Sequence, residues 1–114
     1  MIKSGTYCFW IAPVVGKMTK TPTVYIMTNK RNGTLYIGVT SDIVGRVWEH
    51  KNKTIKGFSS RYGTTQLVWY EFHPTMEGAI HRETDIKRWK RLWKLKLVDE
   101  FNPRWEDLYD ILLE

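Results

Sequence analysis

The feature that most constrains the fold is a pair of short apolar runs that flank a polar turn. Residues 24–27 (VYIM) and 35–39 (LYIGV) are rich in β-branched and aromatic side chains, which favour strands. The turn between them contains Asn-Gly, the strongest short hairpin signal, because both residues tolerate a positive φ. The pattern predicts an antiparallel hairpin. Its alternation sends Tyr25 and Ile37 to definite faces of the sheet but leaves open which face each takes.

A helix is predicted directly after this hairpin. Residues 41–42 (Ser-Asp) offer an N-cap, and apolar residues recur at helical spacing from there to Lys51. Gly45 weakens such a helix by roughly 1 kcal/mol relative to alanine. We therefore expect Gly45 either to pack closely or to leave space beside Arg46. Arg46 and His50 are four residues apart, so their side chains project from one face of the helix.

The remaining segments complete a mixed fold. Residues 66–72 (QLVWYEF) predict a third strand, and a helix follows with Thr75 as its N-cap. In that helix Ile80, Glu83 and Lys87 share a stripe, so Glu83 is expected beside the apolar face. The sequence thus predicts an α+β fold, a small three-stranded antiparallel sheet flanked by helices, in the order β-β-α-β-α-α.

The length of 114 residues allows one domain with a modest core. We expect residues 21–114 to form this domain and residues 1–20 to be an extension outside it. A single cysteine, Cys8, excludes an intrachain disulfide framework and is compatible with a reducing, cytoplasmic location. No run approaches the roughly 18 apolar residues that span a bilayer, so no membrane partner is expected.

Charge is divided unevenly along the chain. Residues 1–96 hold 17 of the 18 Lys and Arg but 6 of the 12 acidic residues, whereas residues 97–114 are acidic. Within that acidic end, residues 105–113 predict a short helix. A basic body favours a polyanionic partner such as nucleic acid. A basic protein without such a partner remains the alternative.

Two stretches carry the cations that suit phosphate contacts. The candidates in and beside the loop of residues 52–63 are Lys51, Lys53 and Arg61, and those of residues 87–96 (KRWKRLWKLK) are Lys87, Arg88, Lys90 and Arg91. A solvated basic loop is the alternative for the first stretch. The second, treated as one basic helix with an apolar stripe, suits a nucleic-acid face, a core-packing helix with a solvated side, or a membrane-surface helix. The Trp and Leu residues are needed for a small core, which disfavours the membrane.

An ordered set of residues gives the chain a family resemblance. VYI at residues 24–26 and YIG at 36–38 place ten residues between Tyr25 and Tyr36. The polar members that follow are Arg46, His50, Glu83 and Asn102. This set resembles the GIY-YIG nuclease superfamily, in particular its small stand-alone branch, which is similar to the catalytic domain of the bacterial excision-repair nuclease.

The resemblance implies a GIY-YIG-like fold and a metal-dependent endonuclease that hydrolyses phosphodiester bonds in DNA, in repair or processing. It implies one Mg²⁺ (or Mn²⁺) held by Glu83, with Arg46 bridging phosphate oxygens. Tyr36 is the candidate that activates the attacking water, with Tyr25 and His50 as helpers or alternatives. The supporting residues are Gly38 and Asn102.

Two departures from the family pattern qualify this hypothesis. Val24 replaces the leading glycine of the first motif, and Val39 stands where some members carry a lysine. The alternative function is a nucleic-acid-binding module that keeps the fold without cutting. A partner protein that provides targeting is a further possibility.

Overall fold

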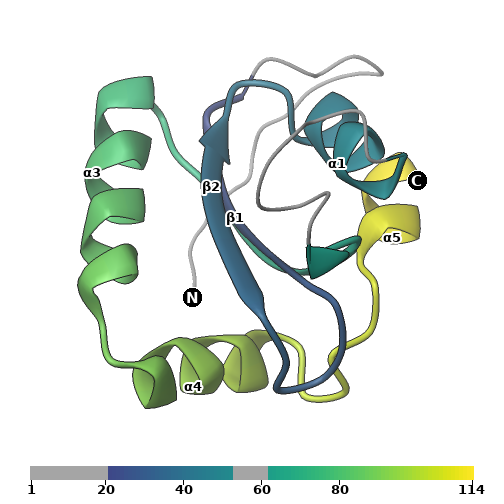
Figure 1. Cartoon of the computed structure of the whole chain (residues 1–114). Coiled ribbons are helices and arrows are strands. Elements are labelled where there is room, and N and C mark those ends of the chain that lie inside the picture. Colours follow the sequence, from purple (N-terminus) through teal and green to yellow (C-terminus); the bar gives the residue numbers. More distant parts are fainter. Residues whose placement is uncertain (1–20, 53–61) are drawn as a thin grey trace.

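In this computed structural model, residues 21–52 and 62–114 are described, and the predicted extension of residues 1–20 lies outside them. The chain forms β1 (Thr23–Thr28), β2 (Leu35–Thr40), α1 (Ile43–Lys51), β3 (Gln66–Phe72), α3 (Met76–Arg88), α4 (Arg91–Phe101) and α5 (Tyr109–Leu113) (Figure 1). The predicted α+β class, with three strands and flanking helices, is confirmed.

The three strands form an antiparallel sheet in the order β2-β1-β3, with β1 in the centre. All six residues of β1 are buried, as expected for a central strand covered on both faces. The predicted hairpin is confirmed: Tyr25 pairs with Gly38 and Ile26 with Ile37. In its turn Asn32 takes the left-handed φ of 55° that an Asn-Gly turn favours.

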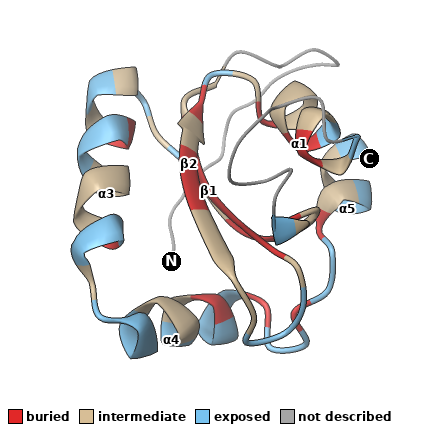
Figure 2. Ribbon diagram, in the orientation of Figure 1, coloured by how far each residue is buried: buried red, intermediate tan, exposed pale blue. Residues whose placement is uncertain are grey.

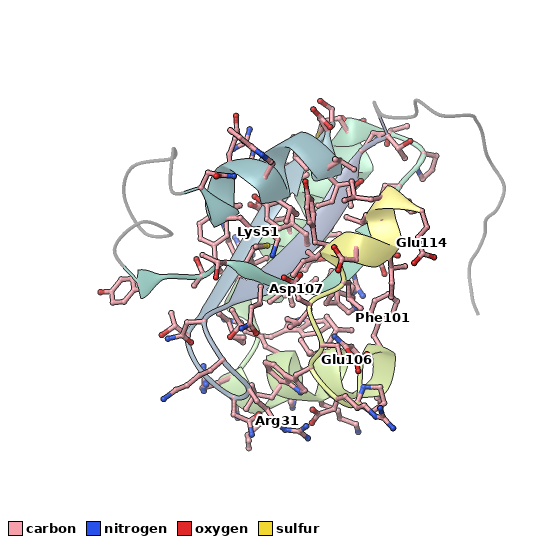
Figure 3. All side chains as sticks on the ribbon, turned by 90° about the vertical axis from the view of Figure 1, so that its right-hand side faces the viewer. Arg31, Lys51, Phe101, Glu106, Asp107 and Glu114 are labelled. Carbon is pink, nitrogen blue, oxygen red and sulfur yellow. The ribbon has the colours of Figure 1, made fainter. Side chains whose placement is uncertain are left out.

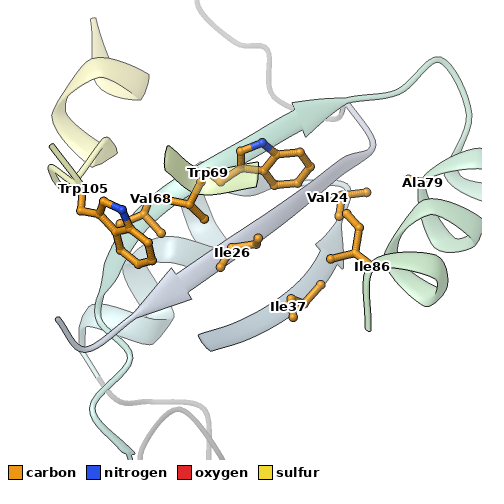
Figure 4. Close-up of a cluster of buried hydrophobic side chains, with 9 residues drawn as sticks. Val24, Ile26, Ile37, Val68, Trp69, Ala79, Ile86 and Trp105 are labelled. Atoms are coloured by element: carbon orange, nitrogen blue, oxygen red, sulfur yellow. The ribbon is translucent and has the colours of Figure 1, made fainter. Parts of the chain in front are cut away.

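Alternation along the strands divides the core between the two faces of the sheet. One face carries a cluster that α3 and α4 cover, and it includes Val24, Ile26, Ile37 and Ile86 (Figure 4). The other face packs against α1 and the C-terminal segment, and it holds the cluster of Tyr25, Met27, Ile43, Val47, Leu67 and Leu108. Tyr25 and Ile37 therefore lie on opposite faces, which hydrophobic alternation alone leaves undecided. Figure 2 shows the buried strip running through the sheet between the two layers of helices.

The helix caps agree with the sequence pattern. Asp42 accepts a hydrogen bond from the Gly45 amide at 3.1 Å, and Thr75 accepts one from the Gly78 amide at 3.0 Å. Gly45 packs closely, because a side chain there would meet the Asp42 carboxylate. Its absent side chain therefore serves the cap rather than opening space beside Arg46.

The predicted continuous helix over residues 87–96 is wrong. Trp89 and Lys90 are extended, with ψ of 154° and 152°, so α3 ends at Arg88 and α4 begins at Arg91. Trp89 packs against the core cluster next to α3, and α4 turns to run across the lower end of the sheet (Figure 1). The element order consequently has one helix more than predicted, β-β-α-β-α-α-α. Core packing outweighs the helical spacing of this stretch.

The C-terminal segment is tied to the sheet and to α1. The Leu108 amide donates to the Leu67 carbonyl at 2.8 Å, and the Leu67 amide donates to the Asp107 carboxylate at 3.2 Å. The Lys51 ammonium pairs with Asp107 and also donates to the Thr65 carbonyl at 3.1 Å (Figure 3). These contacts fix the end of α1, and so help to hold the face that carries Arg46.

Within the described ranges, every helix is too short or too polar to cross a membrane.

Candidate active site

Two tyrosines and a histidine form an aromatic trio between the hairpin and α1. The ring centroids of Tyr36 and His50 are 4.9 Å apart, those of Tyr25 and His50 5.7 Å, and those of the two tyrosines 6.2 Å. The Tyr25 hydroxyl lies 3.1 Å from His50 Nε2, within hydrogen-bond distance. Tyr25 and His50 are buried, whereas Tyr36 is partly exposed. Tyr36 is therefore the member of the trio that reaches the surface.

Gly38 makes room for this arrangement. Gly38 stands directly opposite Tyr25 in the register, and a Cβ at Gly38 would lie 2.5 Å from the Tyr25 hydroxyl oxygen. Real Cβ atoms do not approach other atoms so closely, so a side chain at Gly38 would displace the phenol. The glycine of the YIG motif is thus required by packing in the site, which fits the supporting role predicted for it.

Burial sets the protonation of the inner pair. It lowers the pKa of His50 from its ordinary 6.5 to about 4, and the nearby positive charge of Arg46 adds to this effect. His50 is therefore neutral at neutral pH. Burial likewise raises the pKa of the Tyr25 hydroxyl, with further contributions from Tyr36. Tyr25 keeps its proton, so this pair is suited to positioning rather than to proton abstraction.

Charged groups from two helices act on the trio. Arg46 of α1 partly offsets the raised pKa of Tyr25, whereas the carboxylate of Glu83 on α3 adds to it. Arg46 is partly exposed and its Nε lies 3.3 Å from the Glu49 carboxylate, which limits the directions that the guanidinium can take. The guanidinium is thus near the tyrosines and still open to an anion from solvent.

Glu83 lies on the inner side of α3. Its side chain is 14% exposed and stands in line with the buried Ala79 and Ile86, so the prediction that it lies beside the apolar face is confirmed. Ile80, which the predicted stripe also included, is instead 47% exposed. The Glu83 carboxylate pairs with the ammonium of Lys87 at 3.0 Å.

A shallow hollow joins these groups at the edge of the sheet. It measures about 280 Å³ and is lined by Leu35, Tyr36, Ile37 and Lys87. Because β2 is an edge strand, the hollow can receive groups from both faces: the tyrosines from one side and α3 from the other. Leu35 and Ile37 were missed as wall residues, since an apolar strand pattern contains no signal for such a role.

Comparison with known proteins agrees with this geometry. A family model described as the GIY-YIG catalytic domain matches residues 21–96. The chain belongs to the GIY-YIG family.

Several GIY-YIG relatives are of similar size. A UPF0213 protein of Staphylococcus saprophyticus is 36% identical over 77 residues, which cover 68% of this chain and 93% of that protein. A UPF0213 protein of Staphylococcus epidermidis is 34% identical over 77 residues, with the same coverage. The solution NMR structure of a UPF0213 protein from Bacillus halodurans is 25% identical and covers 80% of this chain and 96% of that one, with a TM-score of 0.49.

Val39, a departure from the GIY-YIG pattern, is a packing residue. It pairs with Val24 across the hairpin and packs against the core cluster beside α3. Val24, the other departure, is fully buried in the same cluster. Both valines thus fill the layer between the sheet and α3, on the face opposite Tyr25.

Asn102 supports the fold around β3. It is buried, and its amide donates to the carbonyls of Val68 at 3.2 Å and Glu106 at 2.8 Å. Its side-chain oxygen accepts from the Glu106 amide at 3.1 Å. Asn102 therefore clamps the turn after α4 to β3, and its supporting role is exerted through the backbone.

The cations predicted to bind nucleic acid have different surroundings. Lys53 and Arg61 lie outside the described residues. Lys51 is held by Asp107 and also lies over the Tyr109 ring, at 5.2 Å from its centroid. Arg91 donates to the carbonyls of Asn32 and Gly33 at 2.8 and 2.7 Å, so it fastens α4 to the hairpin turn.

Arg88 and Lys90 are exposed at the junction of α3 and α4, and neither forms an ion pair with a described residue. Of the predicted cations, these two and Lys87 thus present their charge nearest to solvent.

Proposed function

We propose that this protein is a divalent-metal-dependent endonuclease that hydrolyses phosphodiester bonds in DNA, in repair or processing. The observation that carries the proposal is the convergence at one sheet edge of a partly exposed Tyr36, the buried Tyr25–His50 pair behind it, and the opposite charges of Arg46 and Glu83. Phosphodiester hydrolysis requires an oriented water, positive charge at the phosphate and help for the leaving oxygen.

Tyr36 is the residue proposed to activate the water, because it lines the hollow while the other members of the trio are buried. Tyr25 keeps its proton and donates it in a hydrogen bond to Tyr36, which stabilises negative charge on the Tyr36 oxygen. Neutral His50 then donates its Nε2 proton to the Tyr25 oxygen. The water gives a proton to Tyr36 as its oxygen bonds to phosphorus, and the leaving oxygen takes a proton as its bond to phosphorus breaks.

Arg46 is proposed to bind the scissile phosphate. Its planar guanidinium can donate to two phosphate oxygens at once, a geometry that a lysine cannot reproduce. The ion pair with Glu49 holds the guanidinium near the trio while part of its surface stays accessible. Arg46 therefore stabilises the charge that gathers on the phosphate and fixes its position against Tyr36.

The donor set at Glu83 fits a hydrated Mg²⁺. In the two described stretches no group of three or more His, Cys, Asp or Glu residues could enclose an ion, and Glu83 provides one carboxylate next to the hollow. Mg²⁺ retains several waters and commonly takes one or two protein carboxylates, and Mn²⁺ can replace it. When bound, the cation supplies positive charge to the phosphate and the leaving oxygen.

The test is cleavage of plasmid, single-stranded and branched DNA, and of single-stranded RNA, in Mg²⁺ and in EDTA. Arg46→Ala and Glu83→Gln are each expected to lower the rate by about 10²- to 10³-fold. The matched controls are Arg104→Ala and Glu77→Gln, because both residues are exposed and lie outside the site. The absence of cleavage, with binding retained, would support the non-catalytic binding module instead. Cleavage that survives both site substitutions would refute the assignment of the site.

A further inference from the structure

Lys87 has two neighbours that no single helix pattern brings together. Its ammonium lies 3.0 Å from the Glu83 carboxylate, one helical turn away, and its side chain lines the same hollow as Tyr36. Among the described residues that line this hollow, Lys87 is the charged one. The ammonium is thus next to both the candidate metal ligand and the space where a substrate phosphate would lie.

The two partners differ in how firmly they are held. Glu83 is 14% exposed, so its carboxylate needs a positive partner to offset the loss of water. Lys87 is 53% exposed, and its flexible four-carbon stem lets the ammonium move without disturbing α3. A divalent cation at Glu83 would supply the positive charge that the carboxylate needs and would repel the ammonium.

We propose that Lys87 is an exchangeable counter-ion, which neutralises Glu83 when no metal is bound and contacts a substrate phosphate when a divalent cation takes the carboxylate. This inference rests on the function proposed above, since it takes Glu83 as the metal ligand and a phosphodiester as the substrate. The exchange gives each ligand a reason to favour the other. By linkage, metal binding strengthens the binding of DNA by the same factor as DNA strengthens the binding of metal.

The test is DNA binding in EDTA, where no cleavage and no metal interfere. The probe is a fluorescein-labelled 20-base-pair duplex, measured by anisotropy over a series of KCl concentrations. Glu83→Gln releases Lys87 without metal, so it is expected to tighten binding by about 2- to 5-fold, the factor that corresponds to a partly exposed ion pair. The salt dependence should also steepen by about one phosphate contact.

The decisive comparison is the same substitution in a Lys87→Gln background. There the gain from Glu83→Gln should disappear, because no ammonium is left to release. If the gain persists there, it comes from the loss of a negative charge alone, and the exchange is refuted. Glu77→Gln and Lys90→Gln are the matched controls, since each removes one charge near the site without touching this ion pair.

Binding of Mn²⁺ alone, followed by its paramagnetic resonance signal, gives a second readout. Lys87→Gln removes the competing ammonium and should tighten Mn²⁺ binding by about 2- to 5-fold, while Glu83→Gln should weaken it strongly. Unchanged Mn²⁺ affinity in Lys87→Gln would overturn the exchange. A wild-type protein that binds neither DNA nor Mn²⁺ would overturn the proposed function itself, whereas intact binding without coupling would overturn the exchange alone.

Discussion

Replacing Gly38 with alanine tests whether the site depends on close packing between the two strands of the hairpin. A Cβ at Gly38 would lie 2.5 Å from the Tyr25 hydroxyl oxygen and 2.6 Å from the ring carbon that bears it. Both distances are about 1 Å shorter than an ordinary carbon contact. Tyr25 is fully buried, so its ring cannot move into solvent to relieve the overlap.

The expected loss of stability follows from three contributions. Overpacking a core position costs about 1–3 kcal/mol. A displaced phenol would also break the hydrogen bond to His50 and leave a buried polar group without its partner, at about 1–3 kcal/mol. Removing a glycine from the unfolded chain offsets roughly 0.5–1 kcal/mol of this. Gly38→Ala should therefore lower the free energy of unfolding by about 2–4 kcal/mol.

Urea denaturation followed by tryptophan fluorescence measures this quantity directly. The matched control is Gly78→Ala, where the nearest atom to a new Cβ is the Thr75 hydroxyl oxygen at 3.2 Å, and we expect a change within about 1 kcal/mol. Combining Gly38→Ala with Tyr25→Phe should cost less than the sum of the two single changes, because both disturb the same hydrogen bond. A Gly38→Ala protein as stable as the wild type would refute this explanation of the YIG glycine.

Three further outcomes are expected. Because the pKa of His50 is about 4 in the folded chain and near 6.5 when unfolded, the unfolded state binds the extra proton between these values; stability should fall by at most about 3 kcal/mol as the pH drops from 6.5 to 4, and His50→Gln should flatten the urea midpoint over that window, whereas an unchanged pH profile in the variant would contradict the assignment. Lys51→Met and Asp107→Asn should each cost about 1 kcal/mol in urea unfolding but not add in the double variant, since they share one ion pair; additive losses would show that the contact is unimportant. Asn102→Ala should cost about 2–4 kcal/mol by leaving buried backbone groups unsatisfied, while the folded fraction keeps its rate of DNA cleavage; a slower rate per folded molecule would assign Asn102 to the chemistry.

Local signals in the sequence account for the hairpin, the third strand and both helix caps. Each of these depends on residues within a few positions of one another: period-two alternation, an Asn-Gly turn, and Asp42 or Thr75 bonding to an amide three residues on. Four members of the site lie in this local unit, since Tyr25, Tyr36, Arg46 and His50 all come from the hairpin and α1. That is why the sequence alone brings them close together.

Long-range packing decided the features that the sequence pattern left open or predicted wrongly. The stretch around Trp89 has helical spacing and contains neither Gly nor Pro, yet it breaks because the indole packs against the core next to the sheet. The ammonium of Lys51 is held by Asp107, a residue 56 positions away, and no local pattern predicts such a contact.

The sequence by itself therefore determined the three strands, the caps and the identity of the polar residues, because these depend on local geometry and side-chain chemistry. Only the tertiary structure decided that Tyr25 is buried while Tyr36 lines the hollow, since alternation sets two faces without saying what covers each. It also decided that α3 brings Glu83 and Lys87 to the edge of β2, as an ion pair whose ammonium adjoins the hollow. The physical reason is that the position of α3 depends on burying Ala79 and Ile86 against the sheet, a contact between segments far apart in the chain.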